Sequence, residues 1–242
     1  SELCIIMMKY LIIFILFLSA SASAQYSDKN FGIGLNFVYT TNARIYLTPN
    51  SSNPVERNSY FGLTDIFNPG INIRYKLVEN VMLDLSLEYM QNTATGNNEK
   101  VITNTGLKYI KVEDGFRLIP IELSVYYLIP FSTEKFKFLM GGGVGYYYGS
   151  MIRKFGNAEV SNVERNSAYG IQVAVDVNYL LLENIAFKLE MKFRDPQFIV
   201  RSRYNERQYN YNGTKVTVTR QEFDSKIDIN GVAFVLGTVF YF

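Results

Sequence analysis

The chain has 242 residues, and its 24 Lys and Arg side chains nearly balance its 22 Asp and Glu side chains, which gives a formal net charge of +2 at pH 7. This balance excludes the strongly basic surface that is typical of nucleic-acid-binding domains. The chain has no histidine, which excludes imidazole bases and imidazole metal ligands.

The N-terminal residues predict export from the cytoplasm. A positive charge and the apolar residues 10–18 precede a cleavage site of the A-x-A type at residues 22–24. We therefore expect residues 1–24 to be a cleaved signal peptide, with residues 1–7 upstream of its start. Residues 25–242 are expected to form one β-barrel domain, and they contain no apolar run long enough for a membrane helix.

Alternating apolar and polar residues predict eight β-strands, because successive side chains of a strand point to opposite faces. Asn68-Pro69-Gly70 predicts a bulge or break inside the second strand, whose start stays open. The eighth strand is apolar on both faces, so its orientation also stays open. In chain order the expected strands cover residues 30–39, 59–76, 81–91, 116–129, 136–149, 169–179, 185–194 and 227–242.

The hairpin at residues 169–194 alternates most clearly. The second arm carries Ile185, Phe187, Leu189, Met191 and Phe193 on one face and Lys188, Glu190, Lys192 and Arg194 on the other. Arms of about 10 residues with an apolar face fit tilted strands that cross a bilayer. The charged face cannot contact lipid, so we expect it to look into a barrel.

Three pairs of similar segments recur in the same order and at a nearly constant offset. This repetition predicts two similar four-strand halves, and hence eight strands. The matched segments are 75–89 with 179–193, 55–59 with 163–167, and, more weakly, 32–39 with 141–148.

The expected connections alternate strictly between long and short. Outer-membrane barrels show this asymmetry, with short periplasmic turns and longer extracellular loops. Asn212-Gly213 predicts a hairpin turn. We therefore expect the last long connection, about residues 195–226, to extend above the membrane as a β-hairpin, and the second, residues 92–115, is a further candidate. Residues 150–166 are expected to form a polar loop.

Together the signal peptide, the eight strands, the Gly-Gly-Gly-Val-Gly-Tyr-Tyr-Tyr segment and the terminal Phe242 resemble the small OmpA/OmpX-like outer-membrane β-barrels, often grouped as porin-family proteins. The resemblance covers residues 25–242. It implies an all-β fold, an eight-stranded antiparallel up-and-down transmembrane barrel in the bacterial outer membrane. It also implies a C-terminal pattern that the barrel-assembly machinery reads, from which Thr238 departs. The matching positions are Phe234, Leu236, Phe240 and Phe242.

Ten charged residues, five of each sign, share the inward face of the expected strands. A Lys or Arg facing lipid at mid-bilayer would cost roughly 2–4 kcal/mol, and an eight-stranded barrel is just wide enough to be filled by side chains. Two interpretations stay open, a salt-bridge network that fills the barrel and a polar pore. The residues are Arg74, Lys76, Asp84, Glu88, Glu122, Asp176, Lys188, Glu190, Lys192 and Arg194.

Five basic residues in the last long connection, with tyrosines between them, are candidates for contact with lipopolysaccharide phosphates or with a partner surface. The alternative is a solvated hairpin. The five are Arg201, Arg203, Arg207, Lys215 and Arg220. The glycines at residues 141–145 precede a strand instead of a helix, so we expect close strand packing there and no phosphate cradle.

The leading hypothesis is a membrane-embedded scaffold whose extracellular loops serve surface interaction or adhesion, since a protruding sheet edge can recruit another chain. The alternatives are a narrow passive pore for small solutes or ions, and a secreted lipocalin-like barrel with its apolar face inside.

We expect no enzyme activity, because the usual mechanisms of barrel enzymes need a histidine base. No cofactor or metal is expected. The expected partners are outer-membrane lipid, lipopolysaccharide, the barrel-assembly machinery and an extracellular partner, with no nucleic acid, and the protein is expected to be a monomer.

Overall fold

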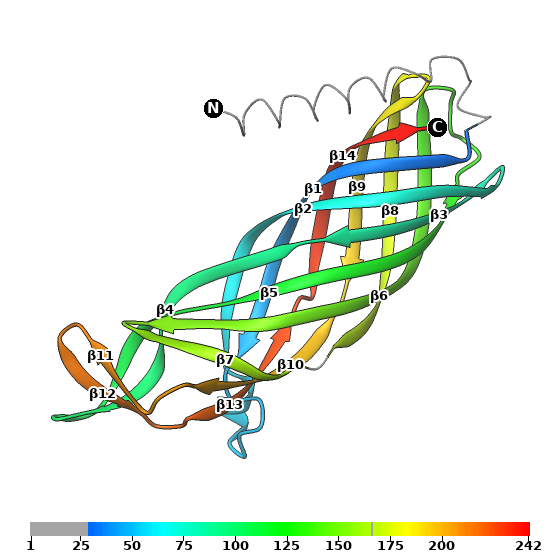
Figure 1. Ribbon diagram of the computed structural model, residues 1–242. Coiled ribbons are helices and arrows are strands. Elements are labelled where there is room, and N and C mark those ends of the chain that lie inside the picture. The colour runs from blue at the N-terminus through cyan, green and yellow to red at the C-terminus, as the bar shows by residue number, and fades with distance from the viewer. Residues whose placement is uncertain (1–28, 166) are drawn as a thin grey trace, which may run out of the picture.

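The computed structural model describes residues 29–165 and 167–242, so the expected signal peptide lies outside the described residues. Antiparallel strands make up nearly all of this part (Figure 1). Its elements are β1 Phe31–Tyr46, α2 Pro54–Asn58, β2 Tyr60–Val78, β3 Val81–Glu88, β4 Met90–Thr103, β5 Gly106–Leu128, β6 Phe136–Phe155, β7 Ala158–Arg165, β8 Ala168–Leu182, β9 Ile185–Arg194, β10 Gln197–Tyr204, β11 Gln208–Tyr211, β12 Thr214–Val218, β13 Glu222–Asp228 and β14 Gly231–Tyr241.

Eight of these strands close a ring, which confirms the expected eight-stranded antiparallel barrel. Around the ring the order is β1, β2, β3, β5, β6, β8, β9 and β14, and β14 pairs back onto β1. Closure leaves the ring without a free edge, so its backbone groups are paired without water.

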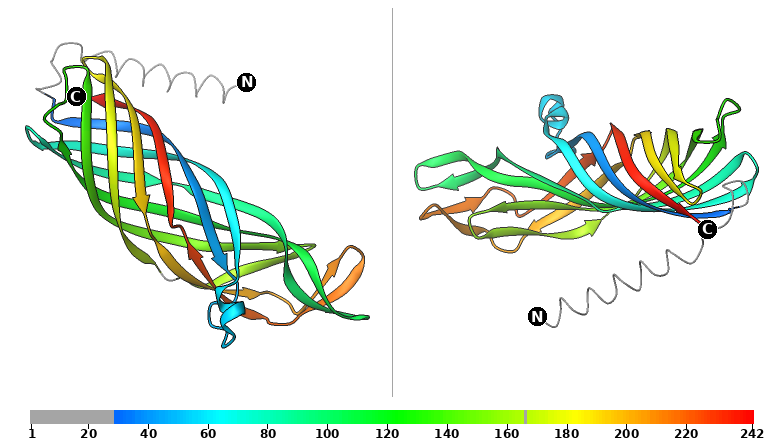
Figure 2. Two further views of the ribbon diagram at one scale, coloured as in Figure 1. Left: turned by 180° about the vertical axis from the view of Figure 1, so that it is seen from behind. Right: turned by 90° about the horizontal axis from the view of Figure 1, so that it is seen from above.

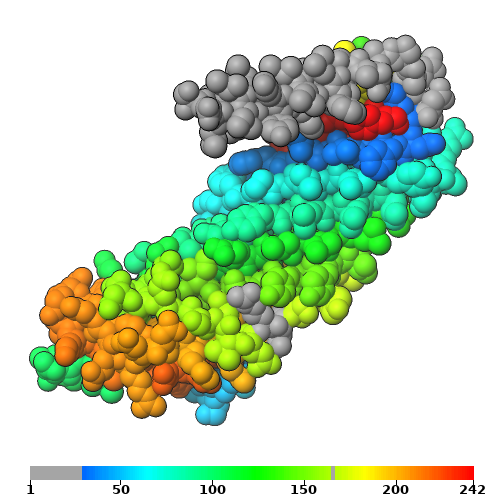
Figure 3. Space-filling model, viewed as in Figure 1, coloured from blue at the N-terminus to red at the C-terminus, as the bar shows by residue number. Residues whose placement is uncertain are grey.

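The long connections continue the barrel as a second body, which we call the extension (Figure 2). It contains β4, β7 and β10–β13, with the far ends of β1, β2, β5 and β6. The β11–β12 hairpin turns at Asn212 and Gly213, whose φ angles are 49° and 78°, and this confirms the turn predicted from the Asn-Gly pair. The extension lies at the end of the molecule remote from the C terminus (Figures 1 and 3).

The two faces of the ring differ as alternation predicts. In β9, Leu189 is 52% exposed and its neighbour Lys188 is 3% exposed. The structure also settles the orientation of β14, in which Val235 and Val239 are buried and Phe234 and Leu236 point outward. A ring that is apolar outside and charged inside suits lipid as its surroundings, and it is the reverse of a lipocalin.

Glycines on β6 allow β5 and β6 to approach closely. A Cβ atom at Gly143 would lie 1.9 Å from the carbonyl oxygen of Leu123, and one at Gly141 would lie 2.3 Å from that of Val125. No side chain fits at these two positions, which confirms the interpretation of the glycine run as a packing feature.

The structure reproduces the sequence repeat in one pair of matched segments but not in another. The β2–β3 pairing shifts register between Lys76 and Val78, and the β8–β9 pairing shifts between Leu180 and Leu182, at equivalent positions of the matched sequences. The shared five-residue motif behaves differently. Its first copy forms most of the exposed helix α2 and its second copy runs into the end of β7. The short motif therefore does not determine a local conformation.

Several strand boundaries were predicted wrongly. Residues 150–166, expected as a polar loop, are mostly strand, because their inner face buries an apolar core inside the extension. Residues 92–115 are mostly strand too, and they form the hairpin between β4 and β5 for which they were a candidate. The eighth strand begins at Gly231, and residues 227–228 end β13.

The predicted break at residues 68–70 is also wrong, since β2 pairs with β1 through Pro69 without a register shift. The Pro69 carbonyl accepts a backbone hydrogen bond from the Tyr89 N–H just beyond the last β2–β3 pair. Because regular β2–β3 pairing has ended at this point, the N–H that proline lacks is not needed for it.

Among the described residues, no helix is long and apolar enough to cross a membrane.

The exposure of the ring predicts a large difference between two Leu-to-Arg substitutions. Leu189→Arg places a charge on the apolar outer face and should lower the free energy of unfolding in phospholipid vesicles by about 2–4 kcal/mol. Leu107→Arg, at a 62% exposed site in the extension, should change it by less than about 0.5 kcal/mol. Urea titration with heat-dependent gel mobility measures both, and equal losses would contradict the assigned faces.

Candidate functional site: the barrel interior

Nine of the ten charged residues that were expected to point inward are buried, with exposures of 4% or less. They come from β2, β3, β5, β8 and β9, and the facing parts of β1 and β6 carry glycines that leave room for long side chains. The nine are Arg74, Asp84, Glu88, Glu122, Asp176, Lys188, Glu190, Lys192 and Arg194.

Arg74 is the centre of the cluster nearer the short turns. Its guanidinium contacts Asp84 at 2.7 Å, forms an ion pair with Asp176, and donates to the Asn178 side-chain oxygen at 3.0 Å. Asn72 donates to the same Asp84 oxygen at 2.6 Å. One cation from β2 is thus held by groups on β3 and β8.

Glu122 is the centre of a second cluster, nearer the extension. Its oxygens lie 2.6 Å from the Lys192 amine and 3.2 Å from the Arg194 guanidinium, and the Tyr147 hydroxyl donates to it at 2.8 Å. Arg194 also contacts Glu88 at 3.0 Å and donates to the Thr40 hydroxyl at 3.1 Å.

Glu190 joins the two clusters. It lies 2.7 Å from Lys188, 3.6 Å from Lys192 and 4.0 Å from Arg74. The nine buried groups therefore form one network of five carboxylates and four cations. Charge pairing of this kind offsets the cost of taking ions out of water.

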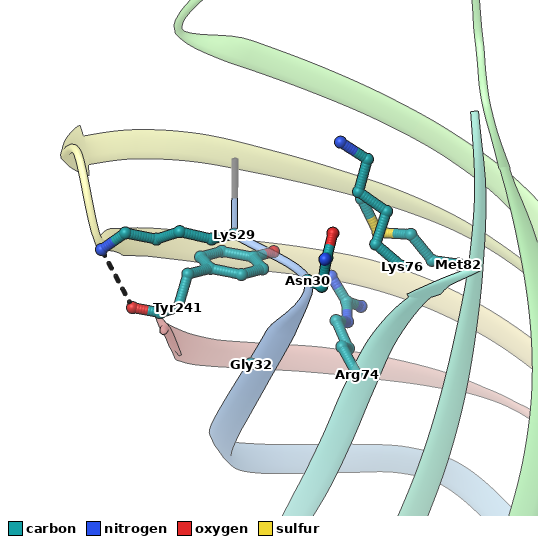
Figure 4. Close-up of a pocket in the computed structure, with 7 residues that line it drawn as sticks. All are labelled: Lys29, Asn30, Gly32, Arg74, Lys76, Met82 and Tyr241. Atoms are coloured by element: carbon teal, nitrogen blue, oxygen red, sulfur yellow. Dashed lines mark hydrogen bonds between the residues drawn. The ribbon is translucent and has the colours of Figure 1, made fainter. Parts of the chain in front are cut away.

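Lys76, the tenth residue, is half-buried at the short-turn end. It lines a small cavity of about 10 Å³ together with Arg74, Met82 and Tyr241 (Figure 4). The cavity lies where the first residues of β1 meet β2, β3 and β14, and Lys29 donates to the Tyr241 carbonyl there at 3.3 Å. A space of this size holds about one water molecule.

A cluster of buried, mostly apolar side chains fills the barrel between the charged network and the extension. We call this cluster the apolar layer. Its side chains come from the walls of the ring and from β4, β10 and β13, so it reaches across the whole interior. Packed apolar side chains of this kind are an unfavourable environment for an ion. The layer consists of Ala43, Ile45, Leu63, Ile66, Met90, Phe116, Leu118, Tyr147, Met151, Ala168, Phe198, Val200, Ile227 and Ile229.

Sequence reasoning named only the charged members of the network as site residues and missed this layer. Asn72 and Tyr147, which donate to its carboxylates, share the inward parity of the charged residues, so the alternation contained the signal for them. The layer was missed because half of its strands were taken for loops or for ends of loops.

The five basic residues of the last long connection do not form one free surface. Arg201 contacts Glu164 at 3.3 Å and Asp224 at 2.9 Å, and Arg203 forms an ion pair with Glu222. Arg207 and Lys215 are exposed, and Arg220 lines a cleft on the extension. Their role in contacting lipopolysaccharide or a partner stays a prediction.

The tyrosines between these basic residues have a structural role. Tyr204 and Tyr209 are 1% and 6% exposed, and their rings pack on Phe155 in the core of the extension.

The residues of the expected C-terminal signal lie on the outer face of β14. Phe234, Leu236 and Phe242 are exposed and Phe240 is half-buried. An apolar stripe on the last strand, interrupted at Thr238, is thus exposed on the outer face, and its recognition by the assembly machinery stays a prediction.

The interior offers little chemistry beyond charge pairing. Its carboxylates contact cations, and among the described residues no group of three or more Asp, Glu or Cys side chains is arranged to hold a metal ion.

Comparisons with known proteins agree on one architecture. The model of the family described as outer membrane protein beta-barrel domain matches residues 10–221. The crystal structure of the outer membrane protein OprG from Pseudomonas aeruginosa is similar with a TM-score of 0.60 and 12% identity, covering 90% of this chain and 99% of that one.

Two other solved structures are similar at lower TM-scores. The outer membrane protease OmpT from Escherichia coli has a TM-score of 0.46 and 12% identity, with 93% of this chain and 100% of that chain covered. Ail, the attachment invasion locus protein of Yersinia pestis, has a TM-score of 0.44 and 8% identity, with 88% and 99% covered. No protein of curated function matches the sequence.

The network predicts that loss of one buried carboxylate is costly. Glu122→Gln keeps the shape but leaves Lys192 and Arg194 short of a charge, so the free energy of unfolding should fall by about 3–5 kcal/mol. The matched control is Glu159→Gln, in an exposed pair with Lys154 on the extension, which should have no measurable effect. Urea unfolding in vesicles tests both, and a stable Glu122→Gln protein would contradict the structural role of the network.

Proposed function

The chain belongs to the family of outer membrane protein β-barrel domains, and on that premise we propose that it is a non-conducting scaffold that displays the extension for surface interaction. The barrel lies in the bacterial outer membrane, so a secreted lipocalin-like protein is excluded. Short periplasmic turns and long extracellular connections are the usual arrangement, which puts the extension outside the cell.

The observation that carries the proposal is the filled interior. Starting from the periplasm, a solute would meet the charged network, whose members are 4% exposed or less, and then the apolar layer. The network alone is compatible with a polar path. The apolar layer opposes such a path, because apart from the Tyr147 hydroxyl its side chains offer an ion no polar partner.

The extension also has the rigidity of a displayed surface. It contains its own apolar core, built around Phe155, Tyr204 and Tyr209 with valines from β4, β5 and β12. At the tip of the β4–β5 hairpin, Ile102 and Leu107 are paired across the strands and are 48% and 62% exposed. An exposed apolar pair on a rigid hairpin favours contact with another surface.

The alternative function, a narrow pore, is favoured by one feature. A cavity of about 650 Å³ opens at the short-turn end among the three short connections, and Lys76 and Met82 lie in its wall. It leads toward the charged network, so a pore would have to pass the network and then open the apolar layer.

The proposal includes no enzyme activity. The interior carboxylates are paired with cations, and the chain has no histidine to act as a base. Lipid and lipopolysaccharide would surround the exposed apolar face, the assembly machinery would act on β14, and the extracellular partner would bind the extension.

The filled interior predicts a silent barrel. The refolded mature protein, with its fold checked by heat-dependent gel mobility, should give no discrete conductance steps in a planar bilayer. Steps that change when Glu190 or Lys188 is neutralised would overturn the scaffold and establish the pore.

The exposed Ile102–Leu107 pair at the hairpin tip predicts that attachment of cells to other surfaces depends on these two residues. Cells of a Gram-negative host that display the protein should attach to polystyrene and to cultured epithelial cells more than control cells do. Ile102→Ser with Leu107→Ser should lower this attachment several-fold, while Lys108→Ser on the same hairpin should not. Surface levels are matched by antibody labelling. Attachment no higher than that of cells without the protein would contradict the proposed function.

A further inference from the structure

A cleft of about 350 Å³ opens on the side of the extension, beyond the apolar layer and apart from the hairpin tip. Its walls are the connection between β1 and β2 that contains α2, residues 97–100 of β4, and residues 219–223 before and in β13. Here β2 and β4 are not paired as neighbouring strands, and the Asn92 side-chain amide donates to the Thr64 carbonyl at 3.1 Å. Its volume is at the lower end of the range for small-molecule sites.

The floor of the cleft is a buried guanidinium that is fixed in place. Arg153 is 4% exposed and donates to both oxygens of Asp114, at 2.6 and 2.9 Å, and to Glu99 at 2.7 Å. The Phe223 ring lies 4.9 Å from its carbon Cζ. These contacts use three of the five N–H groups of the guanidinium, and the Tyr204 side chain interacts with it as well, so at most two N–H groups are left for a ligand.

The charges around the cleft cancel. Lys100, Arg153 and Arg220 stand against Glu56, Glu99 and Asp114, with Asp114 directly behind Arg153. Burial raises the pKa of Glu99 above its ordinary value, although the Arg153 charge opposes this rise. The charges of the site sum to zero, and its surroundings already disfavour the charged form of the buried Glu99 carboxylate. Such a site does not select an anion or a cation. It suits a neutral ligand that both donates and accepts hydrogen bonds.

The cleft also has aromatic walls. Tyr109 is 61% exposed and lines the opening, and Phe223 lies deeper beside Arg153. Aromatic rings offer an apolar face to C–H groups, and amide side chains at Asn97 and Asn98 offer donors and acceptors nearby. The ligand that combines apolar C–H faces with many hydroxyl groups and no charge is a sugar.

From this combination of floor, charge balance and aromatic walls, we propose that the cleft binds a neutral saccharide unit of a surface glycan. Arg153 and Glu99 hydrogen-bond its hydroxyl groups from below, and Tyr109 covers one face of its ring. This inference goes beyond the proposed scaffold function, because the cleft is a site of its own and needs neither the hairpin tip nor a silent barrel.

Saturation-transfer difference NMR tests the proposal on the refolded full chain. The protein is held in lauryldimethylamine oxide micelles, because maltoside detergents would compete. The neutral probes are glucose, galactose, N-acetylglucosamine and lactose, and the charged probes are glucuronic acid and, followed by the protein's own NMR signals, inorganic phosphate. At least one neutral probe should receive saturation, and raised salt should not weaken its binding, since no charge is involved.

Two variants assign the binding to the cleft. Tyr109→Ala should weaken the binding of the positive probe by about tenfold or more, and Arg220→Gln should change it little if the sugar is neutral. Tyr169→Ala, at a 79% exposed aromatic position away from the cleft, is the matched control and should leave binding unchanged. Heat-dependent gel mobility confirms that each variant is folded.

Three results would overturn the proposal. They are no saturation of any neutral sugar, binding that survives Tyr109→Ala, and binding confined to glucuronic acid or inorganic phosphate that disappears with salt. The attachment assay with Ile102 and Leu107 is independent, so failure at the cleft and failure of the scaffold are separate outcomes.

Discussion

The constraint on which the structure depends is that a strand in lipid must place every charge on one side. In the barrel-wall parts of β2, β3, β5, β8 and β9 the outer face is apolar, so nine Lys, Arg, Asp and Glu residues point into a narrow space. There they meet at 2.6–3.3 Å in most pairs, as Lys192 does with Glu122 and Glu88. Room for them comes from the neighbouring strands β1 and β6, where Gly34 and Gly143 leave no side chain. Charge pairing, glycine placement and strand alternation are therefore three aspects of one packing problem.

The ring could be predicted from sequence because this constraint decides the type of each residue separately. With lipid on one face and charges on the other, apolar and polar residues alternate almost perfectly along Ile185–Arg194, and the burial pattern of β9 follows this alternation at every position. The inward parity of Glu122 and Asp176 follows in the same way. The ion-pair partners of each charged residue could not be predicted. Alternation shows which face of its strand a residue is on, but it does not show the level along the barrel axis at which strands from distant parts of the chain meet.

The extension was harder to predict for a physical reason. Its strands have water on the outer face, so Gln91, Lys100 and Lys108 are as acceptable as apolar residues there, and the segment has the composition of a loop. Its inner face is short, and its buried residues come from several hairpins, as Val101, Phe155 and Val216 do. The cleft with Arg153 at its floor was out of reach for the same reason, because it exists only where these hairpins and the α2 connection come together.

The long-range ion pairs of the network have a consequence for the order of folding. Arg74 pairs with Asp176, Glu88 with Arg194 and Glu122 with Lys192, at sequence separations of 102, 106 and 70 residues. Each pair joins the first four ring strands to the last four. Arg74 has a second partner, Asp84, in its own half, but Glu88 and Glu122 of the first half meet their cations only in the second half. A half-barrel would carry these two carboxylates into the bilayer without counterions, which is costly. Insertion and closure should therefore occur as one concerted event, in which the final strands supply the counterions of the first.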